Sequence, residues 1–289
     1  MVIRLISAEL FKLRKRSMTR ILLLVLVSMT VLLYLLLLAI SKANIPVRGP
    51  SETGSIQNLL GLPMALPFAM SILSSFGTVL AIILAASTIG SEYNWRTIRT
   101  MLISSESRLK LLGAKLISVA IFILIGMVVG LATGFIMSLI TTVIGGYAFG
   151  FSFVTGGYLW DQFLQFWRTF FVLVPYMLIG FLFAVVGRSA MPGIALGIGI
   201  FFLESIVTMF MGLAGGWIAR IPDYLLTANV NAITALNNLP QGYGMGPMGG
   251  NTPSSQTPEV SQAFAMLVGY SLVFIALAFY LFRKRDATG

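Results

Sequence analysis

The sequence predicts an all-α membrane protein with six transmembrane helices and both termini in the cytoplasm. Of its 289 residues, 57% are hydrophobic and only 10% are charged, whereas soluble domains carry roughly 25% charged residues. Six apolar runs are each long enough to cross a hydrocarbon core of ~30 Å. Basic residues gather on one predicted side of these runs. This composition excludes a water-soluble globular domain.

The missing residue types exclude several kinds of chemistry. The chain has no cysteine and no histidine, which rules out disulfides, a Ser-His-Asp triad and an HExxH zinc site. The net charge of +10 comes from basic residues beside the spans, so membrane topology explains it and we expect no nucleic-acid partner.

Residues 1–19 are predicted to include a short amphipathic helix. Val2, Ile6, Leu10 and Leu13 alternate with five basic residues between positions 4 and 16. We expect this helix to lie on the cytoplasmic leaflet, where basic side chains bind anionic membrane lipid. The alternative is a plain orientation signal without a helix.

The six spans are expected at residues 21–40, 66–89, 116–144, 169–186, 193–213 and 263–282. The first is too long for a signal peptide and is expected to be an uncleaved anchor. With the termini inside, 15 of the 19 lysines and arginines are cytoplasmic. We therefore expect a multi-pass protein of the cell membrane, folded as one domain over residues 1–289.

Two polar segments interrupt the spans. Residues 91–113 carry Glu92 four positions before Arg96, the favourable order for a helical ion pair, and are expected to form an amphipathic cytoplasmic helix that binds either a protein or the lipid surface. The outer loop, 214–262, contains a stretch at 223–239 that suits short re-entrant helices. A Gly/Pro/Ser-rich run follows it.

Glu204 is the one acidic residue deep in a span. An unpaired charge there costs at least ~2.5–3.5 kcal/mol, so it should face protein or water, or be protonated. With Thr208 it forms a polar strip, and Arg168 is a possible partner. Two interpretations remain open, a polar point on a substrate path and a structural hydrogen bond between helices.

Other small and polar residues recur at helical spacing in the spans. Hydroxyls in the second span form a mild polar strip, although such groups usually bond within the bundle or to their own helix. Small-xxx-small glycine repeats permit close helix contact, either within the chain or between two copies. The residues are Ser71, Ser74 or Ser75, and Thr78 for the strip, and Gly126, Gly130, Gly134, Gly193 and Gly197 for the repeats.

Nothing in the sequence indicates catalysis by this chain. No Gly-x-x-x-x-Gly-Lys-Ser/Thr loop is present to hold nucleotide phosphates. Asp161, Asp223 and Asp286 all lie outside the predicted spans. We expect no enzyme activity, no metal and no bound cofactor.

The layout resembles the permease subunits of ABC-2-type transporters, which are six-span components of bacterial and archaeal ABC exporters. The resemblance is closest in SEYNWRTIRTMLISSESRLKLLGAKL. Glu92, Thr97, Arg108 and Lys115 match the family's acid, Thr, Arg and Lys, whereas Arg96 stands where that family commonly has Gly.

The resemblance implies that residues 91–113 are a coupling helix seated in a separate ATPase. It implies two permease copies and two ATPases that bind ATP and Mg. It also implies a path lined by the second and fifth spans, and an outer gate between the fifth and sixth. The implied coupling residues are Glu92, Arg96, Thr97, Arg99, Arg108 and Lys110, and the implied path residues are Ser71, Ser74, Thr78, Glu204 and Thr208.

The sequence thus predicts the permease subunit of an exporter, with an amphipathic substrate such as a lipid, peptide or drug. One alternative is an ion-gradient-driven secondary carrier, which would need inverted repeats and more intramembrane ionisable groups. Another is a non-transporting immunity or assembly factor with a permease-like fold.

Overall fold

The computed structural model describes residues 2–43, 56–94, 108–147, 150–214, 218–237 and 258–284, and their regular structure is entirely helical. Six of the described helices are long and apolar enough to cross a membrane, so the predictions of an all-helical fold and of six candidate spans are confirmed. The described helices are α1 (Val2–Lys15), α2 (Ser17–Lys42), α3 (Ile56–Leu60), the 3₁₀ helix η2 (Leu62–Met64), α4 (Ala65–Asn94), α6 (Arg108–Gly145), α7 (Gly156–Gly187), α8 (Ala190–Ala214), the 3₁₀ helix η3 (Ile218–Tyr224), α9 (Leu226–Thr234) and α10 (Val260–Lys284).

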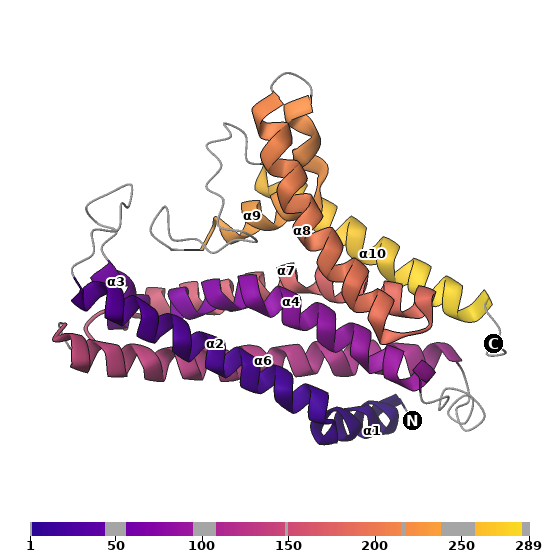
Figure 1. Cartoon of the computed structure of the whole chain (residues 1–289), viewed down its shortest axis with the longest axis horizontal. Coiled ribbons are helices and arrows are strands. Elements are labelled where there is room, and N and C mark those ends of the chain that lie inside the picture. The colour runs from indigo at the N-terminus through magenta and orange to yellow at the C-terminus, as the bar shows by residue number, and fades with distance from the viewer. Residues whose placement is uncertain are drawn as a thin grey trace.

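Figure 1 shows α2, α4, α6 and α7 running together along the long axis, with α8 and α10 diverging from them. α1 and the last turns of α10 lie toward the same end of the molecule as the end of α4 and the start of α6 (Figure 1). α4 is the central helix, since it packs against α2, α6, α7 and α8. A displacement of α4 would therefore act directly on four of the other long helices.

Glycines set the closest helix contacts around α4. A Cβ at Gly130 would lie 2.7 Å from Leu73 Cδ2, and one at Gly134 would lie 2.5 Å from Ala69 Cβ. α8 approaches in the same way, because a Cβ at Gly197 would lie 2.5 Å from Ile82 Cγ2. Gly193 has equally close neighbours on α4 and α7. These four glycines of the predicted repeats therefore face helices of the same chain.

The helix α7 begins at Gly156, well before the expected start of the fourth span at residue 169. Its N-cap Thr155 accepts a hydrogen bond from the backbone N–H of Tyr158, which satisfies one of the donors at the helix start. Trp160 and Trp167 are exposed along this first part. Amphipathic aromatic rings are favoured where a span meets the membrane interface, so the helix continues through a stretch that hydropathy alone excludes.

Two boundaries fall inside the predicted coupling segment. α4 continues to Asn94 and α6 begins at Arg108, so both ends of the expected 91–113 helix belong to spanning helices. Residues 95–107 lie outside the described residues.

The amphipathic N-terminal segment is helical. It ends at Arg16, whose extended backbone (φ −67°, ψ 131°) separates α1 from α2. Leu13 on α1 is buried, whereas Ile3 and Phe11 are exposed. One face of α1 therefore packs on the bundle and the other offers apolar side chains to its surroundings.

Candidate functional site

Five charged residues, which we call the charge cluster, meet where α1, α4 and α6 come together: Glu9, Lys12, Arg16, Glu92 and Lys115. Lys115 is central. Its Nζ donates to Glu9 Oε2 at 2.8 Å and also to Glu92 Oε1. The side chains of Lys115 and Glu92 are only 2% and 1% exposed.

Two further cations complete the charge cluster. Lys12 Nζ donates to Glu9 Oε1 at 2.8 Å, and Arg16 Nη2 lies 3.7 Å from Glu92 Oε1. Arg16 also reaches the end of α4, where its Nη1 donates to the hydroxyl of Ser91 at 2.8 Å and to a backbone carbonyl one turn earlier. The same five side chains thus join α1, the start of α2, α4 and α6.

Such a cluster fixes the relative positions of these helices. A buried charge is tolerated only when it is paired and hydrogen-bonded. Moving α1 away from α4 and α6 would break the buried ion pair between Glu9 and Lys115 and the contact of Lys12 with Glu92. The helices at this end are therefore expected to move together.

The Glu9 carboxylate titrates under opposing influences. Burial raises its pKa, but the charges and hydrogen bonds of Lys115 and Lys12 together outweigh burial and hold the pKa below its ordinary value. The ionised form of Glu9 is therefore the form that the folded protein favours.

Because the pKa of Glu9 is lower in the folded protein than in the unfolded chain, its ionisation stabilises the fold. This contribution is complete above the ordinary glutamate pKa of about 4.3 and is lost as the pH falls through the lower folded-state value. We expect the melting temperature in detergent to fall more steeply with acidification in the wild type than in Glu9→Gln. Parallel pH profiles for the two proteins would contradict this assignment.

The predicted coupling residues have different environments. Glu92 belongs to the charge cluster. Arg108 is the first residue of α6, and Lys110, in the first turn of that helix, is exposed. Arg96, Thr97 and Arg99 lie outside the described residues. Glu9 was not singled out from the sequence, although a single acid within a basic amphipathic helix was a readable signal.

A second polar site surrounds α9. The Glu204 carboxylate of α8 accepts hydrogen bonds from the backbone N–H of Thr227 at 2.9 Å and from its hydroxyl at 2.8 Å. The N–H of Leu226, the first residue of α9, lies 3.4 Å from the other carboxylate oxygen. Glu204 therefore caps the N-terminus of α9. This role is related to the structural hydrogen bond between helices, one of the two interpretations left open by the sequence.

Arg168 binds the opposite end of the same helix. Its Nη1 donates to the carbonyl oxygen of Leu236 at 3.0 Å, just beyond the end of α9 at Thr234. Arg168 and Glu204 thus bind opposite ends of α9 and do not pair with each other among the described contacts. A negative charge at a helix N-terminus and a positive charge at its C-terminus both complement the helix dipole.

Two tyrosines hold the same segment. The hydroxyls of Tyr176 and Thr227 lie 3.2 Å apart in a hydrogen bond, and Tyr270 donates to the carbonyl of Tyr224 at 2.7 Å. Helices α7, α8 and α10 therefore all bind the η3–α9 segment. We call the four side chains on these spans, Arg168, Tyr176, Glu204 and Tyr270, the outer clamp.

Residues 53–288 match the family described as "Protein of unknown function (DUF2705)". The chain belongs to the DUF2705 family. The match includes Glu92, Lys115 and the whole outer clamp, and begins after α1 and α2.

A relative of this DUF2705 protein is "Uncharacterized protein YhcI" from Bacillus subtilis (strain 168), which is 25% identical over 215 residues. The alignment covers 71% of this chain and 63% of YhcI, so the chain spans less than two thirds of that relative's length.

In this DUF2705 chain the predicted path hydroxyls bond to their own helices. Ser74 donates to the carbonyl of Ser71 and Thr78 to that of Ser74, and all three are buried. Thr208 donates to the carbonyl of Glu204. These bonds match the structural interpretation of the strip, and a role in a substrate path stays a prediction.

Gly126 differs from the other glycines of the predicted repeats in how closely a neighbouring helix approaches it. A Cβ there would meet Leu23 Cδ2 at 3.7 Å, an ordinary contact, so helix packing does not require glycine at this position. Across the described ranges, no three His, Cys, Asp or Glu side chains are grouped as a metal site would need.

Proposed function

We propose that this protein is the membrane-spanning permease subunit of an ABC-2-type exporter, driven by ATP that a separate subunit hydrolyses. The observation that carries the proposal is the charge cluster. Glu92 and Lys115, which stand near the two ends of the segment that resembles the coupling motif, bind each other, and Lys115 also binds Glu9 of α1.

This arrangement suits a segment that receives force from a partner. A push on residues 95–107 would act on the end of α4 and the start of α6 together, because separating them means breaking buried ion pairs. α4 packs along α8, and α8 carries Glu204 at the N-terminus of α9. Movement at one end of the bundle would thus be transmitted through packed helices to the outer clamp.

In this proposal the η3–α9 segment is a re-entrant outer gate. Its short helix is held by side chains of α7, α8 and α10, and most of those bonds end on backbone groups of the segment. Small shifts of α8 would lengthen them without unfolding a span. The complex would contain two permease copies and two ATPases, with ATP and Mg on the ATPases, and would export an amphipathic substrate across the cell membrane.

The test is purification of the full chain from native membranes in mild detergent. We expect a soluble nucleotide-binding ATPase to co-purify, and the double variant Arg96→Glu/Arg99→Glu to lose it while membrane insertion and monodispersity are retained. Charge reversal at Glu92 is unsuitable for this purpose, because it would place a fourth cation inside the charge cluster.

Lys42→Glu, at the far end of α2, is the matched control and should retain the ATPase. An unchanged ATPase content in Arg96→Glu/Arg99→Glu would remove the coupling role of this segment. Transport that survives ATP depletion and collapses with an uncoupler would instead establish a secondary carrier.

A further inference from the structure

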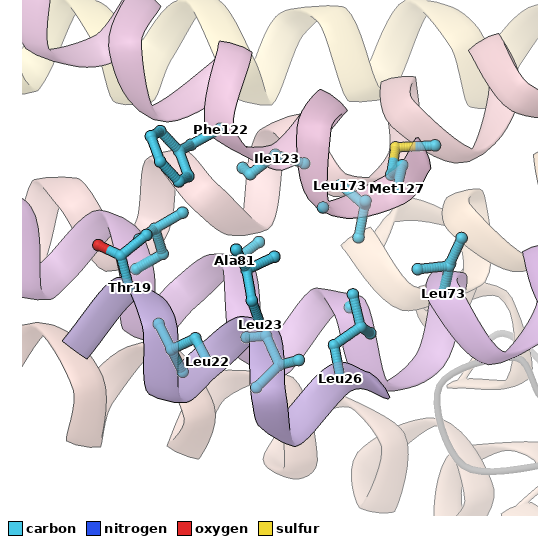
Figure 2. A pocket seen from close by; sticks show the side chains of 14 residues that line it. Thr19, Leu22, Leu23, Leu26, Leu73, Ala81, Phe122, Ile123, Met127 and Leu173 are labelled. Carbon is cyan, nitrogen blue, oxygen red and sulfur yellow. The ribbon is translucent and has the colours of Figure 1, made fainter. Parts of the chain in front are cut away.

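An apolar groove runs between α2, α4 and α6, and Leu173 of α7 also lines it (Figure 2). About 470 Å³ of space free of protein atoms lies within it, its open side included. Thr19 is its only polar lining residue among those described. The groove is lined by Thr19, Leu22, Leu23, Leu26, Leu73, Gly77, Leu80, Ala81, Leu84, Phe122, Ile123, Gly126, Met127 and Leu173.

A wider basic hollow adjoins the groove at the α1 end. The two share Thr19, Leu23 and Phe122, and the hollow adds Arg14, Lys15 and Arg20. Its space of about 690 Å³ includes the open side. None of the described residues that line it is acidic.

The three cations of this hollow are not engaged by described carboxylates. Arg20 Nε donates to the carbonyl of Arg14 at 3.3 Å, and Lys15 Nζ lies 5.7 Å from the centre of the Phe11 ring. All three side chains are exposed, and the nearby Glu9 carboxylate is bound by Lys12 and Lys115. The hollow thus presents uncompensated positive charge beside an apolar channel.

Two glycines keep the groove open. A Cβ at Gly77 would lie 3.8 Å from Leu173 Cδ2, and one at Gly126 would lie 3.7 Å from Leu23 Cδ2. Both are ordinary contacts, so a Cβ at either position would fit without displacing its neighbour. At Gly130, by contrast, the 2.7 Å approach to Leu73 leaves no such room.

We propose that the groove and the basic hollow together bind one anionic phospholipid of the leaflet that surrounds α1. Arg14, Lys15 and Arg20 would bind the phosphate, and an acyl chain would lie between α2 and α6 over Gly126. A soluble anion would leave the apolar groove unused, and an uncharged lipid would leave the three cations unused. Basic pockets between spanning helices are a known form of anionic-lipid recognition.

The experiment measures lipid binding to the full, delipidated chain by native mass spectrometry, with phosphatidylglycerol and phosphatidylcholine as probes. Each basic residue near an anionic headgroup is worth about 5-fold in affinity, so Arg14→Gln/Arg20→Gln should weaken phosphatidylglycerol binding roughly 20- to 30-fold. Lys42→Gln, which removes a cation at the far end of α2, the helix that carries Arg20, should leave phosphatidylglycerol binding unchanged.

Filling the groove tests the acyl-chain half of the site. Gly126→Leu should weaken phosphatidylglycerol binding. If Gly126→Leu does not fold, Gly77→Leu is used in its place. Gly269→Leu is the matched control, because it adds the same bulk to α10 where no atom lies within 4 Å of the new Cβ. Its binding should equal that of the wild type.

Four results would overturn the proposal. Equal binding of the two lipids would show that the hollow does not recognise the headgroup. Wild-type binding by both groove-filling variants would show that no acyl chain lies in the groove. Competition by inorganic phosphate as effective as phosphatidylglycerol would reduce the hollow to a free-anion site. A change of oligomeric state in Gly126→Leu would assign the groove to a helix of a second copy.

Discussion

Replacing Lys115 by methionine should lower the free energy of unfolding by about 3–5 kcal/mol, since removing one partner of a buried ion pair leaves the other charge uncompensated. Methionine matches the length of the lysine stem but leaves Glu9 and Glu92 facing each other inside the charge cluster. Lys12 and Arg16 remain nearby and compensate in part. A melting temperature lower by roughly 10 °C is expected in detergent.

The control is Lys110→Met on the same helix. Lys110 is exposed, and exposed ion pairs are worth at most about 1 kcal/mol, so this variant should melt near the wild type. The double variant Lys115→Met/Glu92→Gln should recover part of the loss, because it removes an orphaned carboxylate along with the cation. Equal melting temperatures for Lys115→Met and Lys110→Met would show that the cluster does not hold these helices together.

Glu204→Leu should loosen α9 while leaving the spanning helices folded. The variant loses three hydrogen bonds, which the backbone N–H groups of Leu226 and Thr227 and the Thr227 hydroxyl donate to the Glu204 carboxyl group at the helix N-terminus. Each such bond contributes about 0.5–1.5 kcal/mol. Amide hydrogen exchange over residues 226–237 should therefore accelerate by about 10- to 100-fold. Mass spectrometry of peptides from this segment measures the change.

Thr208→Val is the matched control for the outer clamp. The Thr208 hydroxyl donates to the carbonyl of Glu204 on its own helix, so exchange in α9 should be unchanged. Arg168→Met, which removes the contact at the opposite end, should loosen the last turn near Leu236 more than the first. Unaltered exchange in both Glu204→Leu and Arg168→Met would contradict the clamp.

The sequence predicted the number of spans because that property depends on local chemistry. A run such as residues 21–40 contains no charge and satisfies its backbone polar groups only as a helix in lipid. The ends were less predictable. α7 begins at Gly156 and α6 at Arg108, because caps and interfacial side chains extend a helix beyond its apolar core.

The partners of the charged residues required the fold. From spacing alone, Glu92 was paired with Arg96, and Arg168 was considered for Glu204. Arg96 lies outside the described residues, so its pairing with Glu92 stays a prediction. Among the described residues, Glu92 binds Lys115, and Glu204 and Arg168 bind opposite ends of α9. Only local spacing can be read from a sequence, whereas these contacts join residues 23 or more positions apart.

Apolar run lengths and the distribution of basic residues were thus enough, by themselves, to specify a six-helix membrane protein and to mark residues 91–115 as its unusual polar segment. Tertiary structure alone decided that Glu9 of α1 completes a buried charge cluster, that one carboxylate caps α9, and that Gly126 opens a groove while Gly130 closes a contact. The physical reason is that hydropathy is a property of each segment, whereas burial of a charge and room for a side chain depend on which helices pack together.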